Sequence, residues 1–177
     1  MQFKTAAGMM QYCRDYIRDA GAMTATLEEN FQVLHNALQT GEDVIVPFTI
    51  ERPESGILKQ DLSQACAVTT DRILLARKKT LGRSIHVIPW KLVEEVTITE
   101  DPSGYDLVNI ATIKEDLTIP LATGEAVRVY DRLAATLKQK RRSALISRIL
   151  TITIIVLVLI AVLFVTYKMG LLPFGKG

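Results

Sequence analysis

The feature that most constrains this chain is an uncharged run of nineteen residues near its end, Ile149 to Tyr167. As a helix rising about 1.5 Å per residue, the run could cross a hydrocarbon layer roughly 30 Å thick. Its many Ile and Val residues would also suit a buried strand, but a strand of this length would be very unusual in so small a domain. Arg148 and Lys168 bracket the run as interfacial anchors do. We therefore predict a transmembrane helix over residues 143–168.

Charge is divided unevenly along the 177 residues. Residues 1–137 hold all 19 acidic residues but only 14 of the 21 Lys and Arg, which leaves a net charge of 14 − 19 = −5. Two of the other seven bases, Lys168 and Lys176, follow the apolar run. The excess of bases on its N-terminal side predicts a single-pass protein of the cell membrane with a cytoplasmic N-terminal domain. The five bases before the run are Lys138, Lys140, Arg141, Arg142 and Arg148.

Charge also indicates which partners to expect. The acidic N-terminal part argues against nucleic-acid binding, whereas the basic segment of residues 138–148 suits anionic lipid headgroups. The first 21 residues lack the apolar core and small-residue cleavage site of a signal peptide, so targeting is expected to depend on the C-terminal span. Cys13 and Cys66 lie far apart without a CxxC motif, which indicates reduced, structural thiols.

Residues 1–40 are predicted to form a helical hairpin. The first helix spans Phe3 to Ala20 and ends at Gly21, and the second begins at Thr26 and stops at Thr40–Gly41. The hairpin is expected to pack on the next domain or on a second copy of the chain; the alternative is a docking element for a partner. The second helix carries an apolar stripe at helical spacing, formed by Leu27, Phe31, Leu34 and Leu38.

Residues 41–142 show the short segments and frequent turn signals of an antiparallel β-domain. Pro47 suggests that the first strand is an edge strand or contains a bulge, and residues 50–64 are expected to be a long connection. The predicted strands are Asp43–Thr49, Ala65–Thr69, Arg72–Lys78, Arg83–Ile88, Leu92–Thr99, Leu107–Ile113 and Leu117–Leu121.

A final helix is predicted from Thr123 onward, and it is expected to continue into the span because no Gly or Pro interrupts residues 125–168. Ser143 is the expected position of any kink. The face predicted to be buried carries Ala126, Tyr130, Leu133 and Leu137, and the side chains predicted to point outward are Arg128, Asp131 and Arg132.

This order, seven strands closed by one C-terminal helix, resembles that of pleckstrin-homology (PH) domains. VTTDRILLA (68–76) resembles the V-T-D-R-R-L-L strand pair of bacterial PH-like domains and of the related GRAM domains. IHVIPWKLVEEVTI (85–98) resembles their I-P-x-x-K-I-x-x-V strand through Ile88, Pro89, Val93 and Val96. The resemblance covers roughly Gly41 to Lys140 and implies a PH-like antiparallel β-sandwich or barrel capped by a C-terminal helix.

The chain departs from the phosphoinositide-binding members of that fold. Their K-x(n)-R-x-R pattern between the first two strands is replaced by TIERPESGILKQDLSQ (49–64), in which acids offset Arg52 and Lys59. The resemblance therefore implies the fold without a specific phosphoinositide site.

One cluster of bases is a candidate for binding anionic headgroups. Arg77, Lys78, Lys79 and Arg83 flank the Thr80–Gly82 turn, so they could gather at one hairpin tip. They would then orient a head that is already tethered to the membrane. The alternative is an ordinary solvated turn.

Catalytic chemistry is not expected. His35 and His86 have no sequence signal that pairs them with a nucleophile, Glu94 and Glu95 should face opposite ways on a strand, and no phosphate-binding loop occurs. Trp90 is expected to plug one end of the barrel, although an interface role is the alternative.

The sequence thus predicts a non-enzymatic, membrane-anchored PH-like interaction module without a cofactor. Its expected partners are the lipid bilayer and an unknown protein, which could be a second copy. The alternative is a sensor of a small molecule or lipid, which the short tail of residues 169–177 makes less attractive. The predicted parts are a hairpin (1–40), a PH-like domain (41–142), a transmembrane helix (143–168) and an extracytoplasmic tail (169–177).

Overall fold

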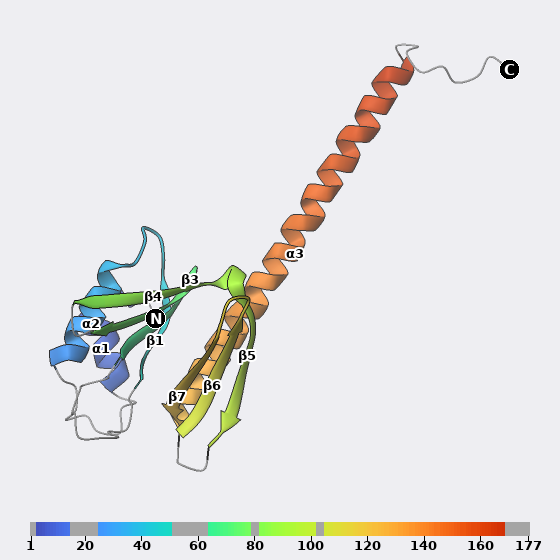
Figure 1. Cartoon of the computed structure of the whole chain (residues 1–177). Coiled ribbons are helices and arrows are strands. Elements are labelled where there is room, and N and C mark those ends of the chain that lie inside the picture. Colours follow the sequence, from blue (N-terminus) through green and yellow to red (C-terminus); the bar gives the residue numbers. More distant parts are fainter. Residues whose placement is uncertain (1–2, 15–24, 51–63, 79–81, 102–104, 169–177) are drawn as a thin grey trace. The chain divides into compact units, whose positions relative to one another are not determined.

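A computed structural model describes residues 3–14, 25–50, 64–78, 82–101 and 105–168 (Figure 1). The chain divides into two compact units, Met1–Leu137 and Lys138–Gly177. The first unit, which we call the head, contains the strands and the N-terminal helices, and the second contains the apolar run.

Seven antiparallel strands form two sheets in the head (Figure 1). They confirm the predicted fold class: two antiparallel sheets, which follow N-terminal helices in the chain and precede a long C-terminal helix. The predicted bounds of β3 are correct, and those of the other strands differ by at most two residues. The first sheet has the order β1 (Val44–Ile50), β2 (Gln64–Thr69), β3 (Arg72–Lys78) and β4 (Arg83–Pro89), and the second has β5 (Val93–Glu100), β6 (Tyr105–Thr112) and β7 (Asp116–Ala122).

The main core joins both sheets to the first turns of α3 (Thr123–Lys168). Phe48 and Ile73 come from the first sheet and Ile110 from the second, and all three are fully buried. On α3, Ala126, Leu133 and Leu137 are buried as predicted, and Tyr130 is half-buried. Val129, which was not predicted, is also fully buried.

A second core lies on the other face of the first sheet, under α1 (Ala6–Arg14) and α2 (Ala25–Asn36). Because successive side chains of a strand point to opposite faces, Cys66 belongs to the main core while Ala65 and Ala67 meet the helices. These small side chains leave room for the large residues of the hairpin. Those fully buried there are Met9, Cys13, Phe31 and Leu34, with Leu27 2% exposed and Leu38 partly buried.

The hairpin therefore packs on the chain's own sheet, as one of the predicted alternatives had it, and a docking role for a partner stays a prediction. The helix ends differ from the prediction. α1 begins at Ala6 instead of Phe3, because the hydroxyl of Thr5 accepts a hydrogen bond from the Gly8 N–H at 3.1 Å and so caps the helix. The described part of α2 runs from Ala25 to Asn36, so the helix ends before the predicted stop at Thr40–Gly41. The predicted end of the first helix at Gly21 and the connection of residues 51–63 lie outside the described residues.

Two bulges shape the strands. β1 is an edge strand with an irregularity between Val44 and Val46, directly before Pro47, as that proline suggested. β5 has another between Val93 and Glu95. The bulge lets Val93 and Val96 both be buried although they are three residues apart, and it leaves Glu94 and Glu95 both exposed. The prediction that the side chains of Glu94 and Glu95 face opposite sides of the strand was therefore wrong.

Candidate functional site

The basic hairpin tip is only partly described. The backbone pairs Lys78 with Arg83 at the end of the β3–β4 ladder, and Gly82 has a φ of 87°, which favours glycine. This register brings the two basic positions opposite each other. The side chains of Arg77, Lys78 and Arg83, and all of Lys79, lie outside the described residues, so their gathering at one site stays a prediction.

The five bases before the apolar run all lie on α3, within the second unit. The helix is uninterrupted at Ser143. Lys138, Arg141, Arg142 and Arg148 are exposed, and Lys140 is half-buried.

The apolar run that follows is exposed along its whole length. Its large apolar side chains, from Ile149 to Tyr167, are each between 47% and 68% exposed. In the part of the chain that the structure describes, α3 is the one helix long and apolar enough to cross a membrane.

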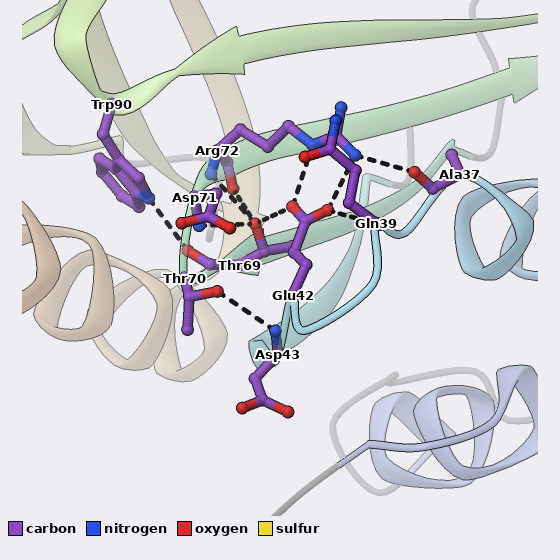
Figure 2. A network of polar contacts seen from close by, with 9 residues as sticks. All are labelled: Ala37, Gln39, Glu42, Asp43, Thr69, Thr70, Asp71, Arg72 and Trp90. Atoms are coloured by element: carbon purple, nitrogen blue, oxygen red, sulfur yellow. Dashed lines mark hydrogen bonds and ion pairs between the residues drawn. The ribbon is translucent and has the colours of Figure 1, made fainter.

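A network of polar groups fastens the helical hairpin to the first sheet (Figure 2). The Arg72 guanidinium on β3 donates from Nε to Oε1 of Glu42 at 2.9 Å and from Nη2 to Oε2 at 2.8 Å. The same Nη2 donates to the carbonyl oxygen of Ala37, just after α2, at 2.8 Å. The Gln39 N–H donates to Glu42 at 2.9 Å, and the Thr69 hydroxyl does so at 2.6 Å. One carboxylate thus links the end of α2 to the β2–β3 turn.

The charge of Glu42 is stabilised where it lies. Burial by itself would raise the pKa of this carboxyl group, but the hydrogen bonds from Arg72, Thr69 and Gln39 outweigh burial and lower the pKa below its ordinary value. Glu42 is therefore ionised at neutral pH. It has no free face toward solvent, because its side chain is 0% exposed, so its role is structural.

Trp90 continues this network into the main core. Trp90 begins a short 3₁₀ helix, Trp90–Leu92, which was not predicted from the sequence. The indole is 5% exposed, and its Nε1–H donates to the carbonyl oxygen of Thr69 at 3.0 Å (Figure 2). Trp90 is therefore buried in the main core, and its role as a plug at one end of the barrel stays a prediction.

Arg128 does not point outward, contrary to the prediction. Its side chain is 15% exposed, its Nη2 lies 3.2 Å from Oε1 of the buried Glu125, and its guanidinium lies 4.8 Å from the ring centroid of Tyr12. The apolar periodicity of α3 identifies the face that packs on the sheets. It does not indicate that α1 covers the side of α3 on which Arg128 lies. Asp131 and Arg132 are exposed as predicted.

Both thiols are free and buried, which supports a structural role. Burial raises the pKa of Cys13, and the charge of Glu125 raises it further while that of Arg128 opposes the change. Burial likewise raises the pKa of Cys66. Neither thiol is therefore a ready nucleophile.

The two histidines have different partners. His35 is half-buried, and its Nε2 donates to the carbonyl oxygen of Lys4 at 2.9 Å. His86 is exposed, with its Nε2 3.0 Å from the Glu115 carboxylate. Among the described residues, no three His, Cys, Asp or Glu side chains are grouped as metal ligands.

Sequence reasoning missed the Glu42–Arg72 pair and the Tyr12–Arg128 contact. The Thr69–Arg72 turn was recognised, but only as a turn. Nothing in the spacing of Glu42 and Arg72, which are 30 residues apart, indicates that they meet.

A solved structure is similar to part of the chain. No family model and no curated protein matches the chain. Among solved structures, it is similar to a DUF1696 family protein with a pleckstrin-homology domain from Shewanella loihica, with 15% sequence identity and a TM-score of 0.45. The match covers 63% of this chain and 92% of that one.

Proposed function

We propose that the chain is a non-enzymatic PH-like interaction module held at the inner face of the cell membrane by α3. The head of residues 1–137 would meet a protein partner, a second copy or anionic headgroups beneath the bilayer. The motifs VTTDRILLA and IHVIPWKLVEEVTI support a place in the bacterial PH branch, which we include in this proposal.

The exposure of the apolar run is the observation that carries the proposal. A core helix of a soluble protein would bury one face, whereas every large apolar side chain from Ile149 to Tyr167 is at least 47% exposed. Its Ile, Leu, Val and Phe residues each favour insertion by a few tenths of a kcal/mol, so together they contribute roughly 4 to 8 kcal/mol. The hydrocarbon of a bilayer would surround the helix on all sides and so remove all of these apolar side chains from water.

The flanking charges support the orientation. Five bases precede the run and two follow it, and a bias of this kind supports a cytoplasmic head. The basic hairpin tip of Arg77, Lys78, Lys79 and Arg83 is proposed to steer the head against the leaflet, since each base near an anionic surface contributes about 1 kcal/mol. Four such bases would contribute about 4 kcal/mol in total. This energy is enough to orient a head that is already tethered, but it is too little to hold a soluble head firmly on the membrane.

Membrane fractionation of the full chain tests the anchor. Wild-type protein should stay with the membranes after an alkaline carbonate wash. Val156→Arg combined with Leu159→Arg places two charges in the run. Each charge raises the free energy of membrane insertion by about 2.5 to 3.5 kcal/mol, so the double variant should be released. Val156→Leu with Leu159→Val is the matched control and should stay bound. Release of the wild-type chain by carbonate would rule out the proposal.

A further inference from the structure

The strand β4 forms one edge of the first sheet. Among the described residues it pairs with β3 on one side and with no strand on the other. A free edge carries backbone N–H and C=O groups with which a further strand can pair. Between Arg83 and Pro89 the strand contains no Lys, Arg, Asp or Glu. The middle of β4 therefore lacks the charges that commonly protect a sheet edge against pairing.

Apolar surface remains exposed along this edge. Successive side chains of a strand alternate between the two faces of the sheet, so Ile85 and Val87 share the face that the helical hairpin covers. Leu74, which is paired with Val87 on the neighbouring strand, is fully buried, whereas Val87 is 40% exposed. The helices thus cover the middle of the first sheet and leave its β4 edge partly bare.

The sequence of β4 is complementary to itself in antiparallel order. An antiparallel copy centred on His86 would place Ile85 opposite Val87 and Ser84 opposite Ile88. The two Ile85–Val87 pairs would lie on the same face as the helices, and opposing β-branched side chains of this kind stabilise paired strands. The apolar surface left exposed at Val87 would be covered in both copies.

The other edge strands do not offer the same match. β5 is an edge of the second sheet, but an antiparallel copy centred on Thr97 would bring Glu94 and Glu95 of one strand near Glu100 of the other. Like charges at opposing positions destabilise paired strands. The remaining edge strands, β1 and β7, contact each other. β4 is therefore the edge best suited to a second copy of itself.

We propose that β4 pairs with β4 of a second copy, in antiparallel order about a two-fold axis at His86, and so joins the first sheets of two heads. The inference rests on the proposed function and deepens it, because it names a second copy as the partner and β4 as the surface that meets it. One pair of strands is a small interface for a stable soluble dimer. Anchoring by α3 compensates, because confinement to one membrane raises the effective concentration of the heads.

Disulfide trapping of the full chain in cell membranes tests the register. In His86→Cys the two Cα atoms should lie about 4.5 to 5.5 Å apart across the axis, which a disulfide can bridge. This change removes only the exposed contact with Glu115. Ser84→Cys, on the same face of β4, is the matched control, because its two copies should lie about 14 Å apart. Mild oxidation should link most of the His86→Cys chain into a dimer, whereas Ser84→Cys and the wild type, with its buried Cys13 and Cys66, should stay monomeric.

A second pair of variants tests the edge itself. Val87→Lys added to His86→Cys places a charge on the exposed edge and should lower the trapped fraction about fivefold. Thr99→Lys, at an exposed position of the β5 edge, should leave trapping unchanged in the same background. Urea unfolding followed by Trp90 fluorescence checks that both variants are folded.

Three results would overturn the pairing in a chain that stays in the membrane after a carbonate wash. They are equal trapping of His86→Cys and Ser84→Cys, a cross-link to a different protein, and equal losses from Val87→Lys and Thr99→Lys. Release of the chain by carbonate would instead overturn the anchor, and with it the confinement on which the pairing depends.

Discussion

Arg72 grips Glu42 with two parallel hydrogen bonds, 2.9 Å from Nε to Oε1 and 2.8 Å from Nη2 to Oε2. Because the Glu42 side chain is 0% exposed, removing Arg72 leaves a buried carboxylate that keeps only the hydrogen bonds from Thr69 and Gln39. Arg72→Ala should therefore destabilise the head by about 3 kcal/mol. Urea unfolding of the full chain in detergent measures this, since the single Trp90 reports the head alone. Arg132→Ala, at an exposed position of α3, should shift stability by less than about 0.5 kcal/mol. Equal shifts in the two variants would contradict the role of the pair.

The same carboxylate predicts a pH dependence. The pKa of Glu42 is lowered in the folded head, so its contribution to stability is full above the ordinary Glu pKa of about 4.3 and is lost as pH falls through the folded pKa. The stability difference between wild type and Glu42→Gln should be constant from about pH 7 to pH 5 and shrink below about pH 4. Comparing unfolding curves of both proteins at each pH removes the effect of other carboxylates. A difference that grows on acidification would refute the assignment.

The apolar stripe of α2 is essential for the second core. Leu34→Asp places a charge at a fully buried position and should cost at least about 3 kcal/mol. Gln32→Asp adds the same charge at an exposed position of the same helix, so it should cost less than about 1 kcal/mol. The measurement is the urea midpoint followed by Trp90 fluorescence. If Leu34→Asp behaved like Gln32→Asp, the hairpin would not be a covering layer of the sheet.

The buried thiols should react only when the head opens. Cys13 and Cys66 are buried, and the pKa of each is raised, so the reactive thiolate is scarce and inaccessible. Both should be labelled by a thiol reagent at the rate of unfolding, which urea accelerates. Arg128→Ala, which removes the contact between α3 and Tyr12 on α1, should speed labelling of Cys13 more than that of Cys66. Rapid labelling of either thiol without urea would contradict their burial.

The strands were predictable because their limits are set locally. Thr70–Asp71 and Gly82 mark the turns around β3, and alternating apolar residues fill the strands between such signals. The apolar stripe of α2 was predictable for the same reason, since its period belongs to one helix. The surface against which the stripe packs, the chain's own first sheet, could not be predicted from the helical spacing of its residues.

The polar contacts depend on packing between elements and could not be read from spacing. Glu42 and Arg72 meet because the end of α2, the start of β1 and the β2–β3 turn converge (Figure 2). Arg128 was misassigned because a helical wheel identifies the apolar face but gives no sign of a second neighbour, here α1. The bulge in β5 likewise breaks the alternation on which the prediction for Glu94 and Glu95 depended.

The most direct test of a cytoplasmic head anchored by α3 is cysteine labelling across the membrane of intact cells. Lys176→Cys lies after the apolar run and Asp131→Cys lies in the head before it. With the five-to-two excess of bases before the run, an impermeant maleimide should label Lys176→Cys in intact cells, and Asp131→Cys only after permeabilisation. Labelling of both positions only after lysis, or of Asp131→Cys from outside, would contradict the proposed anchoring and orientation.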